Sequence, residues 1–481
     1  MENTLYSMER AHFDHQRQAH WDEIARKPKS WGNFGGDYHR RLTNIYQFAV
    51  PSDGRVLEIG CGAGDLLAAL SPRHGVGVDF SAEMIQLARQ KHPKLTFLQM
   101  DAHSLALDGV FDVVILSDLL NDVWDVQAVF QQVARYITPD SRVIINSYSR
   151  LWEGPLALVE KLKLAKPLLN QNWLTVEDIQ NLLYLSGFEV IRTWSEILWP
   201  LNTPLVANFL NKVVVRLWPF NHLALTNFVI ARLKPQASLQ STPPSVSVII
   251  PARNEAGNIA QIIARTPEMG RGTELVFVEG HSKDDTLQTI RAEIEKHPQR
   301  NCRLMTQTGM GKGDAVRMGF ANATGDILMI LDADMTVPPE DLRRFYAALA
   351  SGQADFVNGV RLVYPMADQA MQALNFVGNK FFSMAFTWLL GQPIKDTLCG
   401  TKVLRATDYA RIVANRAYFG EFDPFGDFDL LFGAAKLNLK IVDLPIRYGS
   451  RTYGTTNIQR WKHGWLLLRM VAFAASRIKF V

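Results

Sequence analysis

The chain has 481 residues, 47% of them hydrophobic, which exceeds what one core normally holds, so two or three domains are expected. The formal net charge of +4 is too small to indicate nucleic-acid binding. The three cysteines lie far apart without metal-ligand spacing, which predicts a reducing cytoplasm. A polar start predicts no signal peptide, and no uncharged run reaches the roughly 20 residues that a membrane-spanning helix needs.

The first motif follows a predicted helical region at residues 1–50. Residues 55–67, RVLEIGCGAGDLL, read as a strand, three alternate glycines and the start of a helix. Glycines at such a bend let a ligand approach the backbone closely, because no Cβ atom stands in the way. A second strand ends at Asp79, nineteen residues after Gly60, where a carboxylate can accept the hydroxyls of a ribose.

Five further strands complete the first half, at residues 95–100, 111–116, 142–146, 188–194 and 228–233. VLEIGCGAGD, VDFS and QMDAHSL together resemble the class I S-adenosylmethionine-dependent methyltransferases, over roughly residues 40–233. The resemblance implies a Rossmann-like α/β domain with a doubly wound, seven-stranded sheet, and we place this domain at residues 1–234. It also implies a set of cofactor-binding residues: Glu58, Gly60, Gly62 and Gly64 at the methionine end, Asp79 at the ribose, Asp101 and Ala102 at the adenine, and Ser117 at the end of the fourth strand.

The residue that assists the methyl acceptor is left open by the sequence. Methyl transfer is a direct displacement, so a base is needed only where the acceptor must lose a proton. The candidates are His39, His103, Asp118 and Asp122, and each of them is equally well explained as a structural hydrogen-bonding group. Residues 198–220 are rich in Trp, Leu and Val; we expect them to pack in the core, with an apolar acceptor pocket as the alternative.

A Pro- and Ser-rich stretch at residues 235–245 is predicted to be a linker, and a new α/β half begins after it. In this half, residues 327–331 form an apolar run followed by Asp332-Ala333-Asp334. The run suits a strand buried on both faces of a parallel sheet, and its carboxyl end is where such sheets bind ligands. Paired carboxylates there suit Mg²⁺ or Mn²⁺ carrying a diphosphate, which is what sugar transfer from a nucleotide-sugar requires.

Several ordered motifs resemble the family 2 glycosyltransferases of GT-A fold, most closely the dolichyl- and polyprenyl-phosphate hexose synthases. They are PARNEAGNI, GKGDAVRMGFANATGD, LDADMTVPPED, KDTLCGTKVLR and RTYGTTN, within residues 246–457. The resemblance implies an inverting transfer of a hexose from a UDP- or GDP-sugar. It assigns nucleotide-sugar binding to Pro251, Asn254, Glu255, Glu279, Lys312, Asp332 and Asp334, metal binding to Asp332 and Asp334, and acceptor binding to Arg361 and Arg451.

The match has departures that leave the nucleotide and the acceptor open. Glu279-Gly280 stands where the family usually has two adjacent Asp residues, Thr336 where a Gln is frequent, and Asn457 where a Lys is usual. Asp427 stands where other branches of the family keep a catalytic base, which a hydroxyl acceptor needs and a phosphate acceptor does not; a helix N-cap explains it equally well.

The carboxy-terminal segment at residues 458–481 is predicted to be an amphipathic helix, and residues 376–390 are a second amphipathic candidate. Basic residues beside Trp and Leu are typical of a helix lying in a bilayer surface, with docking on the protein's own core as the alternative. We therefore predict a bifunctional enzyme, peripheral on the cytoplasmic face of the membrane, that acts on a lipid-linked or cell-surface glycan precursor. The alternative is a glycosyltransferase whose first half is only a binding module.

Overall fold

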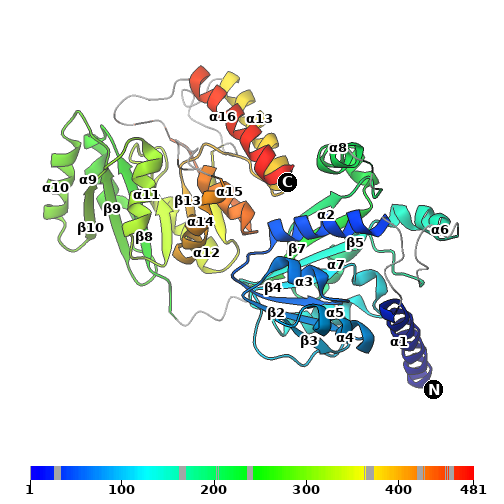
Figure 1. Cartoon of the computed structure of the whole chain (residues 1–481). Coiled ribbons are helices and arrows are strands. Elements are labelled where there is room, and N and C mark those ends of the chain that lie inside the picture. The colour runs from blue at the N-terminus through cyan, green and yellow to red at the C-terminus, as the bar shows by residue number, and fades with distance from the viewer. Residues whose placement is uncertain are drawn as a thin grey trace. The chain divides into compact units, whose positions relative to one another are not determined.

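The structure is a computed structural model that divides into two compact units, Met1–Lys234 and Pro235–Lys479 (Figure 1). It describes residues 2–26, 34–161, 169–201, 203, 205–235, 242–361, 363, 373–419, 426, 428–449, 451, 453 and 460–480.

In the first unit, a central sheet is covered by helices on its two faces. The strands are β1 (Arg55–Ile59), β2 (His74–Asp79), β3 (Thr96–Gln99), β4 (Val113–Ser117), β5 (Arg142–Tyr148), β6 (Phe188–Glu196) and β7 (Thr226–Leu233). The helices are α1 (Glu2–Arg26), α2 (Phe34–Ala49), α3 (Asp65–Leu70), α4 (Ala82–Lys91), α5 (Val126–Ala134), α6 (Glu153–Lys161), α7 (Val176–Leu185) and α8 (Val206–Lys212). Short helical turns are η1 (Leu120–Asp122), η2 (Arg150–Trp152), η3 (Val214–Arg216) and η4 (Phe220–Leu223).

The described strands of this unit form a seven-stranded sheet in the order β3-β2-β1-β4-β5-β7-β6, which confirms the predicted fold. Strand β1 pairs in parallel with β2 on one side and with β4 on the other, while β7 runs antiparallel to both of its neighbours. The chain therefore changes direction across the sheet between β1 and β4. In open α/β sheets, ligands bind at the carboxyl ends of the strands at that switch point.

The second unit repeats this plan with different helices. Its strands are β8 (Val246–Ala252), β9 (Thr273–Glu279), β10 (Asn301–Thr306), β11 (Ile327–Ile330), β12 (Phe356–Val360), β13 (Lys402–Arg405) and β14 (Ile441–Pro445). Its helices are α9 (Ile259–Arg265), α10 (Thr286–Lys296), α11 (Lys312–Asn322), α12 (Leu342–Ala350), α13 (Ala373–Leu390), α14 (Ala406–Ala414), α15 (Phe428–Lys436) and α16 (Arg460–Ala474). Shorter turns are η5 (Ala256–Asn258), η6 (Pro339–Asp341), η7 (Arg416–Tyr418) and η8 (Ala475–Lys479).

The order in the second sheet is β10-β9-β8-β11-β13-β12-β14, and its switch point lies between the parallel strands β8 and β11. All four residues of β11 are buried, as the apolar run predicted for a strand covered on both faces. The acidic motif follows β11 directly, so it lies at the carboxyl end of a central strand, beside the segment that follows β8.

The two predicted amphipathic segments of this unit form helices that pack against each other, α13 and α16 (Figure 1). Within the described residues, no helix is long and apolar enough to cross a bilayer. Residues 198–220 of the first unit differ from the expectation of core packing, because many of their large apolar side chains are exposed.

The tight approach of Gly325 to strand β8 generates a stability prediction. A methyl group at Gly325 would lie 2.5 Å from the backbone nitrogen of Ser247 and 2.6 Å from the backbone carbon of Val246. Because these atoms belong to a central strand that cannot move aside without losing its pairing, we expect Gly325→Ala to destabilise the second unit by about 2 kcal/mol or more.

Urea unfolding of the full chain, followed through the transition of the second unit, measures this change. The control is Gly378→Ala in α13, where an added methyl group meets no atom within 4 Å. That substitution is expected to leave the second unit unchanged or to stabilise it by up to about 1 kcal/mol. Equal effects of the two substitutions would contradict the steric explanation.

Candidate functional site

The glycine loop after β1 is held against β2 by hydrogen bonds from the backbone N–H groups of Gly60 and Cys61 to the carbonyl oxygen of Val78, at 2.7 and 3.0 Å. Gly60, Gly62 and Gly64 have φ angles of 76°, 49° and 74°, a region that L side chains rarely adopt. At Gly62 an added Cβ would meet no atom within 4 Å, so the loop has open space over its middle glycine. This open backbone suits the close approach of a ligand.

Asp79 at the end of β2 is fixed by the same loop. One carboxylate oxygen accepts the N–H of Gly62 at 2.9 Å, and the other accepts the N–H of Ser81 at 2.9 Å. The side chain is buried, and this burial raises the pKa of Asp79 against the effect of the two backbone hydrogen bonds. A carboxylate oxygen has more than one acceptor position, so Asp79 keeps the capacity to accept ligand hydroxyls.

The other predicted cofactor residues lie around this loop. Glu58 is buried in β1 and accepts the N–H of Leu67 at 3.2 Å; burial raises its pKa to about 8. Asp101 is partly exposed after β3, and Ala102 beside it is buried. Ser117 is the last residue of β4. The structure thus brings the predicted residues to the carboxyl ends of neighbouring strands.

Helix α1 contributes residues that the sequence did not single out. It reaches the loops after three strands: Ser81 after β2 through a hydrogen bond to Asp22, Asp101 after β3 through Arg10 at 3.4 Å, and Asp122 after β4 through Arg17 and Trp21 at 2.8 and 2.6 Å. The helix is polar on average and its apolar residues do not gather on one face, so its hydrophobic pattern gave no signal of what it packs against. It lies along the ligand-binding edge of the sheet.

Three of the four candidate methyl-acceptor bases have structural roles or lie on the surface. His103 uses both ring nitrogens, one against Asp101 at 2.7 Å and the other accepting the N–H of Asp125 at 3.1 Å. Asp122 holds α1, as described. His39 is exposed on α2, with its ring edge-on to Tyr38.

Asp118 is the fourth candidate, and its surroundings are different. It follows β4 with a φ of 53°, and its carboxylate accepts the Tyr38 hydroxyl at 2.8 and 3.0 Å and the Asn146 amide at 2.5 Å. Asn146 is oriented in turn by the Tyr46 hydroxyl at 2.6 Å. Asp118 is partly exposed, yet the surrounding protein desolvates it and raises its pKa to about 7.

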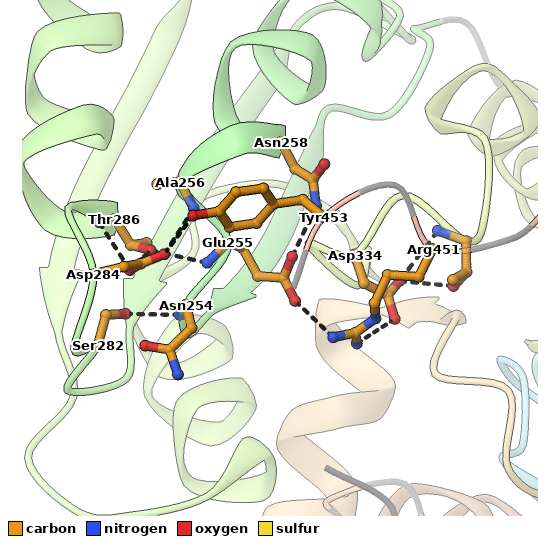
Figure 2. Close-up of polar contacts among 11 residues, drawn as sticks. Asn254, Glu255, Ala256, Asn258, Ser282, Asp284, Thr286, Asp334, Arg451 and Tyr453 are labelled. Carbon is orange, nitrogen blue, oxygen red and sulfur yellow. Dashed lines mark hydrogen bonds and ion pairs between the residues drawn. The ribbon is translucent and has the colours of Figure 1, made fainter. Parts of the chain in front are cut away.

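In the second unit, the segment after β8 is tied to the segment after β9 (Figure 2). The Asn254 N–H donates to the Ser282 hydroxyl at 3.0 Å, and the Asn254 side-chain oxygen accepts the Lys283 N–H at 2.7 Å. Glu255 is buried and accepts the Asn258 amide at 2.7 Å. Pro251 lies within β8, three residues before Asn254. These bonds fix the PARNE motif at the carboxyl edge of the sheet.

Arg451 joins the acids that follow the two switch-point strands, as Figure 2 shows. Its guanidinium lies 3.3 Å from Glu255 and 2.9 Å from Asp334. Burial raises the pKa of Glu255 to about 7, and the positive charge of Arg451 opposes the rise. The other oxygen of Asp334 accepts the Thr336 hydroxyl at 2.7 Å.

Asp332, the first acid of the motif, pairs with Lys312 at the start of α11, at 2.6 Å. A side chain at Gly400 would collide with both Asp332 and Lys312, so the KDTLCGTK segment packs directly on them. Residues far apart in the sequence, from β11, α11 and the segment before β13, therefore meet around this carboxylate.

Comparison with known proteins gives a family to each unit. The family described as "Glycosyl transferase family 2" matches residues 247–411, and the family described as "Methyltransferase domain" matches residues 51–197. The chain joins a methyltransferase domain to a family 2 glycosyltransferase domain. Each match covers the switch-point acids or the glycine loop of its own unit.

Two curated relatives illustrate the similarity. The chain is 28% identical over 228 residues to the glycosyltransferase AglJ of Haloferax volcanii, covering 47% of this chain and 70% of AglJ. It is 32% identical over 120 residues to the undecaprenyl-phosphate 4-deoxy-4-formamido-L-arabinose transferase of Pseudomonas aeruginosa, covering 24% of this chain. The chain spans only 35% of the length of that transferase.

Solved structures resemble each domain at low sequence identity. An S-adenosylmethionine-dependent methyltransferase from Mesorhizobium loti is 21% identical, with a TM-score of 0.32, and the match covers 42% of this chain and 100% of that one. Glucosyl-3-phosphoglycerate synthase from Mycobacterium tuberculosis, in complex with Mn²⁺ and UDP, is 19% identical, with a TM-score of 0.36 and coverages of 49% and 80%.

Of three further residues named from the sequence for the glycosyltransferase, the structure describes two, and both are buried. Arg361, expected at the acceptor, is buried and bonds Asp396 through two nitrogens at 2.7 and 2.8 Å, so its charge is matched inside the protein. Asp427 lies outside the described residues. Glu279 is buried at the end of β9 and accepts the Ser282 N–H at 2.6 Å.

The donor set of the glycosyltransferase domain fits a hard divalent cation. Asp332 and Asp334 supply carboxylate oxygens, which Mg²⁺ and Mn²⁺ prefer. Among the residues that the structure describes, no cluster of three His, Cys, Asp or Glu side chains forms a closed metal cage. A site with only two carboxylate ligands suits a cation whose remaining coordination positions are filled by water and phosphate oxygens.

Proposed function

We propose that the chain is a bifunctional enzyme that transfers a hexose from a nucleotide-sugar to a lipid-linked or glycan acceptor and methylates with S-adenosylmethionine. The meeting of Glu255 and Asp334 at Arg451, beside the switch point between β8 and β11, carries the glycosyl part of the proposal. Asp332, two residues before Asp334, pairs with Lys312 after the same strand. We place both activities in the biosynthesis of a cell-surface glycan or glycolipid, and both rest on the two family matches.

In the glycosyltransferase domain, Asp332 and Asp334 would hold Mg²⁺ or Mn²⁺. That cation would neutralise the charge building on the departing diphosphate. Pro251, Asn254, Glu255 and Glu279 would line the nucleoside of a UDP- or GDP-hexose. Lys312 and Arg451, which now pair with the acids, would turn to the phosphates, because guanidinium and ammonium groups bind phosphate well.

The acceptor we favour is a polyprenyl phosphate. One curated relative is an undecaprenyl-phosphate 4-deoxy-4-formamido-L-arabinose transferase, which supports a lipid phosphate here. Such an acceptor is already anionic and needs no base, whereas a hydroxyl acceptor would call on Asp427. One in-line attack on the anomeric carbon would invert its configuration.

In the methyltransferase domain, the glycine loop, Asp79, Asp101 and Ala102 would hold S-adenosylmethionine, which supplies a methyl group on a cationic sulfur. We assign the acceptor side to Asp118, at the end of the strand next to the loop. Its carboxylate would take the proton of an acceptor hydroxyl, while Tyr38 and Asn146 orient it. A pKa near 7 suits a general base.

The paired helices α13 and α16 support binding to a membrane surface on the cytoplasmic side. Each buries one face, with Phe386 and Leu390 on α13 and Met470 and Ala474 on α16 among the buried side chains. Each also exposes large apolar side chains, which are Phe381, Met384, Trp465 and Leu468. Exposed Lys380 and Arg469 lie beside them, and basic groups next to Trp and Leu favour an interfacial position.

Replacing Asp334 tests the metal role. Asp334→Ala should lower turnover of the nucleotide-sugar by about a hundredfold or more, because the departing diphosphate loses its charge stabilisation. Turnover is measured by release of the nucleotide from UDP- and GDP-hexoses with Mg²⁺ and Mn²⁺. Asp341→Ala, at an acid in the same segment, should retain activity. Retained turnover in Asp334→Ala would refute the metal role.

Paired variants separate methyl transfer from cofactor binding. Asp118→Asn should slow methyl transfer to a membrane-lipid extract by about a hundredfold or more, since a general base contributes that much. In the parent, the rate should rise with pH up to about 7, as Asp118 deprotonates, and level off above it; the variant should lack this rise. Isothermal titration should show unchanged S-adenosylmethionine binding in Asp118→Asn and weakened binding in Asp79→Ala. Binding without methyl transfer in the parent would favour the binding-module alternative.

The apolar face of α13 and α16 has its own test. Trp465→Ser with Leu468→Ser should lower binding of the full chain to anionic vesicles by about tenfold, because two interfacial side chains no longer leave water. Vesicle flotation measures the change. Val413→Ser, at an exposed apolar residue of α14, serves as the control. Unchanged flotation of the double variant would exclude this face.

A further inference from the structure

The segment between β6 and β7 of the methyltransferase domain, residues 197–225, exposes an unusual number of large apolar side chains. We call it the apolar insertion; residues 202 and 204 lie outside the part that the structure describes. Its exposed members are Trp199 (36% exposed), Leu205 (83%), Val206 (51%), Phe209 (60%), Leu217 (42%), Trp218 (80%), Phe220 (45%) and Leu223 (54%). So many exposed large apolar side chains within one segment are typical of an interaction surface.

The exposed apolar side chains of the insertion are distinct from those that pack into the domain. The insertion has a separate inward set, in which Ile197, Val215, Ala224 and Leu225 are almost fully buried. Apolar residues are thus divided between an inner and an outer side. The outer side still needs an explanation.

The insertion is also firmly anchored to the domain. Within the insertion itself, the Asn211 side chain bonds both the N–H and the carbonyl oxygen of Trp199, each at 2.7 Å, and so braces the segment internally. Arg216 pairs with the buried Glu196 of β6, and Arg41 of α2 reaches the same carboxylate at 3.3 Å. Exposure of the apolar side chains is therefore a property of a fixed surface.

Leu205 is exposed although its backbone adopts an unfavourable conformation. Its φ is 67°, a positive value that L side chains rarely adopt and that glycine adopts readily. It is nevertheless the most exposed large apolar residue in the part of the chain described. Val206 and Phe209 follow it one turn apart on α8, at the rim of the unit in Figure 1.

The charges of the insertion indicate the kind of partner. The sequence contains no Asp or Glu from residue 197 to residue 254. Lys212 and His222 are exposed among the apolar side chains, whereas Arg216 is paired with the buried Glu196. Trp, Phe and Leu next to basic groups, without acids, match the boundary of an anionic bilayer, where Trp sits at the headgroups and Lys contacts lipid phosphate.

We propose that the apolar insertion of the methyltransferase domain docks on an anionic lipid bilayer. This contact is separate from that of α13 and α16 and does not rest on either catalytic activity. It would bring the methyltransferase site to lipid-linked acceptors without help from the glycosyltransferase domain.

Vesicle flotation of the full chain tests the proposal. The patch variant carries Leu205→Asn, Phe209→Ser and Trp218→Ser; the matched control carries Tyr184→Ser and Leu185→Ser, at exposed residues of α7 in the same unit. Vesicles contain phosphatidylcholine with or without phosphatidylglycerol. We expect the patch variant to bind anionic vesicles at least about tenfold less than the parent, and the control to bind within about twofold of it.

The same comparison is made in a protein that also carries Trp465→Ser and Leu468→Ser. In that background, membrane binding through α13 and α16 cannot mask the effect of the patch substitutions. A tenfold loss in both backgrounds supports the proposal. Equal binding of the patch variant and its parent in both backgrounds overturns it, as does an equal loss in the α7 control.

A second variant preserves the test if the patch variant fails to fold. Lys212→Gln should reduce the preference for anionic over neutral vesicles by about fivefold, because one basic group near the surface is lost. An unchanged preference would count against the lipid contact. Light scattering distinguishes another occupant: a dimer that the patch substitutions dissociate, with vesicle binding unchanged, would assign the surface to a second copy of the chain.

Discussion

The parallel pairing of β8 with β11 is the constraint on which the glycosyltransferase site depends. Ile330 pairs with Ile249, so the segments that leave these two strands start at the same edge of the sheet. The acids that follow, Glu255 and Asp334, therefore come close enough to share one guanidinium. A shift in this register would separate them, and the buried faces of β11 oppose such a shift.

The methyltransferase domain applies the same rule with different chemistry. Its switch point lies between β1 and β4, and the chain places glycines after the first strand and Asp118 after the second. Open backbone at the glycines leaves room for a ligand, and the desolvated Asp118 carboxylate, held by Tyr38 and Asn146, follows the strand paired with β1. Helix α1 then ties the loops of this edge together.

Much of this arrangement could be predicted from local pattern. A buried apolar run that ends in an acid, or a strand that ends in alternate glycines, indicates both an element and its carboxyl end, which is why the positions of Asp79 and Asp334 at strand ends were predicted. Partners distant in sequence leave no such mark. Arg451 lies 117 residues from Asp334, and Arg361, expected at the acceptor, is instead buried against Asp396.

Amphipathic and apolar segments were predicted less well because hydrophobicity does not say what covers a side chain. Trp218 and Phe209 belong to a stretch whose composition fits a core, yet the anchors at Asn211 and Arg216 turn them outward. For α1 the packing was missed for a different reason: the helix is held to the domain by ion pairs and hydrogen bonds, which a hydrophobic pattern does not reveal.

The bridge made by Arg451 has a consequence for the order in which ligands arrive. With Arg451 between Glu255 and Asp334, and Lys312 on Asp332, each of the three acids already has a cation beside it. A bare divalent ion must displace these cations and leave them near its own charge, which is unfavourable. An ion that enters already chelated by a diphosphate offers each displaced cation an anion, so charge balance favours joint entry over stepwise loading.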